Sequence, residues 1–173
     1  MNRGAELHFD SVLDALVQVT DDPTWSARLS ELARTRDQVL HVAVMREPYL
    51  SLLLEGTKTI ESRFSARRIQ PFGRVHPGDV LALKRQSGPL VGLALVTEAR
   101  FYELDAEVLQ SLRDQYAPEL AATDDRFWQE RSQAAYATLI DVVDPSVVPE
   151  VAVRKRDRRG WASLAPLTPA LLG

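Results

Sequence analysis

The feature that most restricts the fold is a series of short, β-branched apolar runs that end near proline, glycine or aspartate. They occupy 41–45, 79–84, 90–98 and 136–143, and the mostly polar residues 57–64 are expected to alternate as a further strand. Runs of this length suit strands, and the turn residues between them stop the chain from continuing as one long helix. Helical patterns at 105–116 and 124–133 come late in the chain. We therefore expect an α+β domain with a small, mostly antiparallel β-barrel and peripheral helices.

The first forty residues have a different pattern. Residues 10–19 place their apolar side chains on one helical face, and a second amphipathic helix is predicted to start near Asp22, where Pro23 suits the first turn. We expect residues 1–40 to form a helical N-terminal extension and residues 41–173 to form the main domain. The two helices either pack on the barrel or offer a surface to a protein partner, and the sequence leaves both open.

Composition narrows the class of protein. The 173 residues contain no cysteine, which excludes disulfides and thiolate metal sites. No run approaches the roughly 18 apolar residues that a membrane helix needs. We expect a cytoplasmic protein without membrane association.

Three charged residues follow a predicted helix at 47–55 that ends at Gly56. Lys58, Glu61 and Arg63 lie within six residues of one another, in a segment expected to alternate as a strand. Lysine and arginine can hold a phosphate, and a carboxylate can accept a hydrogen bond from a base amino group. On spacing alone an ordinary surface ion pair is the better explanation of these three residues.

Basic residues gather in two segments of a chain whose net charge is −3. One segment is 46–85, and the other is the run RKRDRR, which supplies Arg154, Lys155, Arg156, Arg158 and Arg159. If the two segments meet, they form a positive face that can contact a nucleic-acid backbone; otherwise each is a solvated surface. Tyr136, which opens a predicted strand, is a further candidate ligand contact. Trp128 and Trp161 are expected in the core.

The run EPYLSLLLEGTKTIESR resembles the signature of ASCH domains, in which a strand after a helix carries the pattern G-x-K-x-x-E-x-R. Gly56, Lys58, Glu61 and Arg63 match it. The resemblance continues through the HPGD turn, FWQERSQAAYATLIDVV and KRDRRGW, and covers residues 41–164. It implies a PUA-like barrel with a ligand cleft beside the first helix of the barrel domain, and a role in RNA biology. We expect this cleft to bind single-stranded RNA or a nucleotide.

Two enzyme activities occur among the ASCH relatives that the chain resembles. Amidohydrolases that act on acetylated cytidine have a lysine at the position of Lys58 and a threonine where this chain has Glu61, so the departure weakens that hypothesis. Ribonuclease chemistry needs an acid and a base, and the three histidines, His8, His41 and His76, are scattered. Lys58 and Glu61 remain the candidate catalytic residues, and whether the protein is an enzyme stays uncertain.

Other classes of function have no motif in this chain. There is no metal-binding spacing, no phosphate-binding P-loop, no dinucleotide fingerprint and no serine-hydrolase motif. We therefore expect neither a metal nor a cofactor. A protein interaction module that uses the N-terminal helices is the third alternative.

Overall fold

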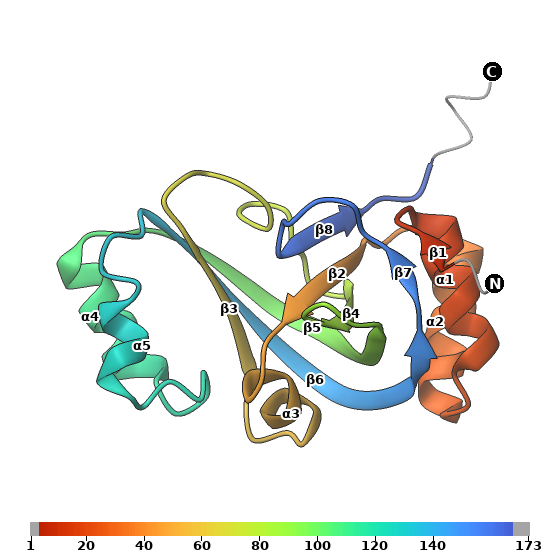
Figure 1. Ribbon diagram of the computed structural model, residues 1–173, viewed down its shortest axis with the longest axis horizontal. Helices are drawn as coiled ribbons and strands as arrows, with labels where there is room; N and C mark the ends of the chain where they lie inside the picture. Colours follow the sequence, from red (N-terminus) through yellow and green to blue (C-terminus); the bar gives the residue numbers. More distant parts are fainter. Residues whose placement is uncertain (1–3, 168–173) are drawn as a thin grey trace.

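The computed structural model describes residues 4–167 (Figure 1). In chain order its elements are β1 (Ala5–Glu6), α1 (Phe9–Val19), α2 (Pro23–Thr35), β2 (Leu40–Met45), α3 (Tyr49–Leu54), β3 (Ile60–Ser65), β4 (Val80–Arg85), β5 (Leu90–Glu103), α4 (Ala106–Tyr116), α5 (Asp125–Gln129), β6 (Tyr136–Val151), β7 (Val153–Arg154) and β8 (Trp161–Leu164). The expected α+β class is confirmed.

One curled sheet organises the fold. Its six strands lie in the order β3-β6-β5-β4-β2-β8, and the short β1 and β7 pair separately. The β2–β4 pairing is parallel, while the other four pairings of the large sheet are antiparallel. The sheet is therefore mixed. In the described part of the chain its edge strands, β3 and β8, do not pair with each other, so the sheet is a half-barrel where the sequence predicted a barrel.

The two long strands differ most from the sequence prediction. β5 continues to Glu103 and β6 to Val151, well beyond the apolar runs at 90–98 and 136–143. Their polar parts remain extended because each strand supplies the backbone hydrogen-bonding partners of the other. α5 is shorter than predicted and ends at Gln129.

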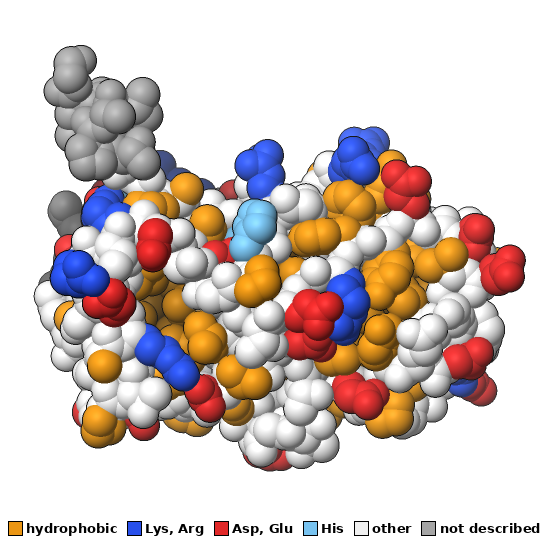
Figure 2. Space-filling model, turned by 180° about the vertical axis from the view of Figure 1, so that it is seen from behind, with side chains coloured by type: hydrophobic (Ala, Val, Ile, Leu, Met, Phe, Trp, Pro, Cys, Tyr) orange, Lys and Arg blue, Asp and Glu red, His pale blue; other side chains and the backbone are white. Residues whose placement is uncertain are grey.

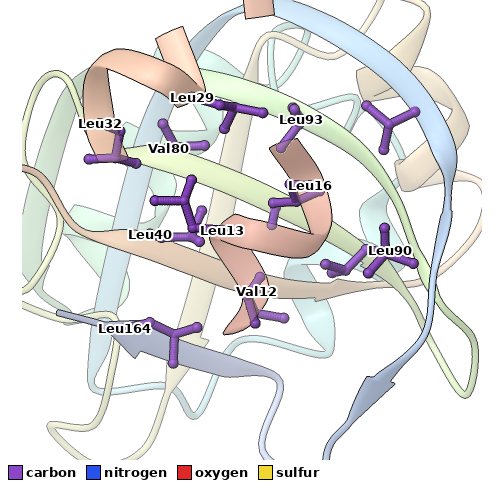
Figure 3. Close-up of a cluster of buried hydrophobic side chains, with 14 of the residues drawn as sticks. Val12, Leu13, Leu16, Leu29, Leu32, Leu40, Val80, Leu90, Leu93 and Leu164 are labelled. Atoms are coloured by element: carbon purple, nitrogen blue, oxygen red, sulfur yellow. The ribbon is translucent and has the colours of Figure 1, made fainter. Parts of the chain in front are cut away.

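The N-terminal helices pack on the sheet (Figure 3). Side chains of α1 and α2, among them Leu13, Leu16 and Leu29, lie in one buried cluster with Leu40 of β2 and Leu93 of β5. Trp25 of α2 also donates a hydrogen bond from Nε1 to the Asp144 carbonyl at 2.8 Å. The apolar stripe of these helices is therefore buried against the sheet, and a protein partner would have to use their polar faces.

Two further clusters of buried side chains hold α3 and α5 against the sheet. Leu50 and Leu53 of α3 pack into one, and Phe127 and Trp128 of α5 pack with Ile60 of β3 in the other. Trp128 and Trp161 are 4% and 3% exposed, which confirms that both belong to the core. α3 and α5 are thereby held near β3, where the candidate cleft lies.

Acidic side chains gather at the end of the molecule that carries α4 and α5. Figure 2 shows several of them on the face opposite to that of Figure 1. Glu107 and Asp114 of α4 and Asp125 of α5 are among the exposed acidic residues of this region. Within residues 4–167 no helix has both the length and the apolar character needed to cross a membrane.

Candidate functional site

A left-handed turn at Gly56 brings Lys58 to the start of β3. Gly56 has φ +84°, which only glycine adopts without strain. The Lys58 amide then donates to the Leu52 carbonyl at 2.9 Å, so the chain folds back against α3. Residues 57–59 are consequently not part of the strand, and the strict alternation expected over 57–64 is wrong. For this reason Lys58 lies on the same cleft as Glu61 and Arg63 rather than facing away from them.

Lys58 is a buried cation held by backbone oxygens. Its side chain is 2% exposed, and Nζ donates to the carbonyls of Ile60 at 2.6 Å and Leu120 at 3.0 Å. Nζ also lies 3.9 Å from Oε1 of Glu61 and 5.7 Å from the ring centre of Tyr49. Burial lowers the pKa of Lys58, while the carboxylate of Glu61 acts in the opposite direction. The lysine therefore joins three segments of the chain at the floor of the cleft.

Glu61 stands between two cations. Its Oε1 accepts a hydrogen bond from the Ser62 amide at 2.6 Å, and its Oε2 lies 3.6 Å from a guanidinium nitrogen of Arg63. A carboxylate has about four acceptor positions, so these contacts leave acceptor capacity for a ligand. Glu61 is only 5% exposed, so its carboxylate is buried between these two cations.

Arg63 spans the open side of the half-barrel. From edge strand β3 its guanidinium donates to the carbonyl of Val44 in β2 at 2.8 Å and to that of Gly160, just before β8, at 3.0 Å. It also lies over the Trp161 ring, 5.1 Å from its centre. A side chain thus connects the sheet edges that the backbone leaves unpaired.

Arg131 forms a flat wall on the α5 side of the cleft. Its guanidinium carbon is 3.5 Å from the ring centre of Phe127 and 5.4 Å from that of Phe64. One nitrogen donates to the Phe127 carbonyl at 2.8 Å, which fixes the plane of the group. A stacked guanidinium of this kind offers a planar, cationic face on which a base can stack.

These residues line a cleft of about 460 Å³. The volume falls within the range of small-molecule sites. The remaining lining residues are Val44, Met45, Arg46, Tyr49, Ser62 and Glu130. Its floor and walls therefore combine buried charges with aromatic surface, a lining that suits a polar, planar ligand.

A second hollow, of about 530 Å³, adjoins the cleft. Val44, Arg46 and Arg63 line both hollows. The other residues that line the second hollow are Lys84, Gln86, Ser87, Lys155, Asp157, Arg158, Arg159 and Gly160. We call this hollow the basic groove, because its lining includes six cationic side chains and one acidic one. The two basic segments of the sequence meet here.

The structure divides the run RKRDRR between two surfaces. Lys155, Arg158 and Arg159 line the basic groove. Arg154 and Arg156 line a separate hollow beside Glu6 and Leu7. There a guanidinium nitrogen of Arg154 lies 3.9 Å from a carboxylate oxygen of Glu6. Residues that are neighbours in the run therefore line different surfaces.

Tyr136 does not line the cleft. It packs edge-on against Phe72 with ring centres 5.1 Å apart, and Arg68 lies over both rings. Tyr136 is therefore part of an aromatic cluster away from Lys58 and Glu61.

Sequence reasoning missed four residues of the site: Arg46, Tyr49, Lys84 and Arg131. Arg46 follows a buried strand, and Lys84 lies near the end of another. A charged residue at the end of an apolar strand could have marked both as candidate site residues. No local pattern indicated Tyr49 or Arg131, because the contacts of α5 with β3 bring Arg131 to the cleft.

Two of the scattered histidines meet at one aspartate. Nε2 of His41 lies 2.8 Å from Oδ2 of Asp79, Nδ1 of His41 lies 2.9 Å from Oγ of Ser163, and the His76 amide donates to Oδ2 of Asp79 at 2.9 Å. His41 is fully buried and lies outside both hollows. In residues 4–167 no group of three or more His, Cys, Asp or Glu side chains could hold a metal ion.

The α+β fold with its curled, mixed six-stranded half-barrel is consistent with an ASCH domain. The ASCH domain model matches residues 44–146, and the chain belongs to this family, which is generally linked to RNA binding. A comparison with curated proteins finds no match.

Solved structures show the same fold. The chain is similar to ASCH from Zymomonas mobilis, with a TM-score of 0.52 and 12% identity over 65% of this chain and 73% of the other. A mutant form of that protein gives a TM-score of 0.57 and 13% identity over 72% of this chain and 87% of the other. The likeness at these identities concerns the fold alone.

Proposed function

We propose that this protein binds single-stranded RNA or a nucleotide, with a base in the cleft at Lys58, Glu61 and Arg131 and the sugar-phosphate backbone along the basic groove. The observation that carries the proposal is that the two hollows adjoin through Val44, Arg46 and Arg63. A ligand that is planar at one end and anionic at the other matches this arrangement. Membership of a family linked to RNA binding supports the same function.

The cleft has the groups needed to recognise a base. Glu61 can accept a hydrogen bond from an exocyclic amino group, and Arg131 on its aromatic support offers a stacking face. Lys58 and Arg63 already donate to backbone carbonyls, so their main part is to fix Glu61 and the cleft wall. Preorganised groups of this kind reduce the entropy lost on binding.

The basic groove supplies the contacts to phosphate. Arg46, Arg158 and Arg159 are exposed, and none of them forms an ion pair within the described part of the chain. Exposed arginines without acidic partners are free to neutralise backbone phosphates. Such contacts add affinity without discriminating between bases.

The test is the affinity for single-stranded RNA oligonucleotides, measured by fluorescence anisotropy over a salt series. Affinity should fall with salt by roughly 0.7 log units per log unit of salt for each phosphate neutralised. The Arg46→Gln, Arg158→Gln variant should weaken all sequences alike and flatten this slope. Glu61→Gln should instead change which base is preferred.

Arg34→Gln is the matched control, because Arg34 is an exposed arginine on α2, paired with Glu31 and outside both hollows. It should bind as the wild type does. The proposal would be overturned if the double variant, Arg46→Gln with Arg158→Gln, and the single variant Glu61→Gln both bound with wild-type affinity.

One observation favours a second candidate, a hydrolase that acts on a modified nucleoside. Burial lowers the pKa of Lys58, as the chemistry of a lysine base or nucleophile requires. The two carbonyls bound by Nζ and the nearby Glu61 act against this role. Release of acetate from acetylated cytidine by the wild type, abolished in Lys58→Arg, would establish it.

A further inference from the structure

Lys84 is a buried cation without an acidic partner. It belongs to β4, is 8% exposed and lines the basic groove. Its Nζ makes one long hydrogen bond, 3.4 Å, to the carbonyl of Arg85. Within residues 4–167 no carboxylate lies within ion-pair distance of it. Burying an uncompensated charge costs free energy, so the position favours an anion that is supplied from outside.

The surroundings of Lys84 add positive charge. Burial lowers the pKa of Lys84, and the neighbouring Lys155 lowers it further. The Lys155 side chain is 6% exposed, and its Nζ pairs with Asp157 at 2.5 Å. Arg46 and Arg158 line the same groove. With Arg63 and Arg159, the hollow therefore presents two lysines and four arginines, against which Asp157 supplies one negative charge.

Lys84 lies one strand away from the cleft wall. It is the register partner of Val44, and Val44 lines both the cleft and the basic groove. Neighbouring strands are about 4.8 Å apart, so a group bound at Lys84 is close to a group bound in the cleft. The cleft and the basic groove also share Arg46 and Arg63, so one ligand can place its base in the cleft and its phosphate in the groove.

The geometry points to Lys84 and Lys155 as a phosphate-binding pair that selects a nucleotide over a free nucleoside, with the base in the Lys58–Glu61 cleft. This inference rests on the proposed function and makes it specific, because the ligand must then carry a phosphate on the nucleotide whose base is bound. A phosphate dianion offers several acceptors to the lysines and arginines of the groove and offsets the charge buried at Lys84. A neutral modified nucleoside leaves that charge uncompensated.

The test compares the affinities of the four ribonucleosides, their 5′- and 3′-monophosphates and inorganic phosphate, measured by titration calorimetry on the full chain. At least one monophosphate should bind about tenfold or more tightly than its nucleoside, in line with one charge-assisted hydrogen bond. Lys84→Met should remove that advantage. Asp157→Asn should increase it, because it removes the negative charge that pairs with Lys155 and leaves Nζ bound to the backbone carbonyl of residue 157. The amide oxygen can still accept from the Arg159 amide.

The stability of each variant separates binding from folding. Lys84→Met removes a buried charge and keeps the apolar stem, so its unfolding midpoint in urea should equal or exceed that of the wild type. Arg34→Gln is the control for the loss of a positive charge outside the groove.

The possible outcomes are distinguishable. The inference would be overturned, and the proposed function left standing, if nucleosides and monophosphates bound with equal affinity. The same conclusion would follow if monophosphates still bound more tightly than nucleosides in Lys84→Met. Failure of the wild type to bind any nucleoside, monophosphate or RNA oligonucleotide would remove both. A monophosphate advantage that is lost in Lys84→Met and larger in Asp157→Asn supports the inference.

Discussion

At the scale of single residues, the two buried lysines differ in what compensates their charge. Nζ of Lys58 binds two carbonyls and approaches Glu61, whereas Nζ of Lys84 has one long contact. Burial of a charge is tolerated when hydrogen bonds and an opposite charge surround it, and it is costly otherwise. Lys58 is therefore part of the fold, while Lys84 is available to a ligand.

The same substitution at these two lysines should have opposite effects on stability. Lys58→Met leaves the Ile60 and Leu120 carbonyls without their donor and Glu61 with one cation fewer, so we expect a loss of about 3 kcal/mol. Lys84→Met should be neutral or stabilising. Urea unfolding measures both, and a Lys58→Met protein as stable as the wild type would contradict the account of the cleft floor.

The pH dependence of stability provides a second check on Lys84. Its pKa in the folded protein lies below the ordinary value of 10.5, so between these two pKa values the unfolded chain binds more protons. The contribution of Lys84 to stability should therefore increase as pH rises through that window. Phosphate affinity should fall over the same range as the lysine loses its charge. The difference in the free energy of unfolding between the wild type and Lys84→Met, measured by denaturation at several alkaline pH values, isolates the effect.

At the scale of elements, the side chain of Arg63 links the two edges of the half-barrel, which backbone hydrogen bonds would link in a closed barrel. It joins β3 to Val44 and Gly160 across the gap between the sheet edges. Lysine has one point charge in place of the planar fork, so it cannot reproduce both contacts in the same geometry.

We therefore expect Arg63→Lys to destabilise the protein by about 1–2 kcal/mol, since one charged hydrogen bond is lost. Amide hydrogen exchange should accelerate in β3 and β8 more than in β4 and β5, which lie inside the sheet. The matched control, Arg34→Lys on α2, should leave the exchange pattern unchanged. A uniform acceleration over all strands would show that Arg63 acts on global stability instead.

The elements show where prediction from sequence succeeded. The start of α2 at Pro23 after Asp22, the end of α3 before Gly56 and the presence of α4 follow from capping and turn residues. The polar ends of β5 and β6 could not be predicted, since their apolar alternation stops while their pairing continues. Local propensity is weaker there than the hydrogen bonds between the two strands.

At the scale of the whole molecule, acidic and basic side chains gather in different regions. Acidic side chains gather around α4 and α5, and basic side chains line the groove formed near β4, β8 and the segment that follows β7. A net charge of −3 conceals this separation. An anionic ligand is steered by the local field, so the overall sign does not oppose binding.

The N-terminal helices cover a large apolar area of the sheet. The sequence divided the chain into an extension, residues 1–40, and a main domain, residues 41–173, yet Leu13, Leu16 and Leu29 are fully buried against sheet residues. Each such side chain contributes about 2 kcal/mol. We expect a chain that begins at residue 39 to be molten or aggregated, as judged by near-UV circular dichroism and amide dispersion. A well-dispersed spectrum would support the domain boundary at residue 40.

The sequence by itself determined the α+β class, the family and the segment that carries the cleft. These follow from short apolar runs, turn residues and the motif around Gly56, all of which act over a few neighbouring residues. Only the tertiary structure decided that the sheet stays an open half-barrel, that Arg131 borders the cleft and Lys84 the basic groove, and that the RKRDRR run divides between two surfaces. These features depend on contacts between residues far apart in the chain, which the spacing of residues along the sequence does not encode.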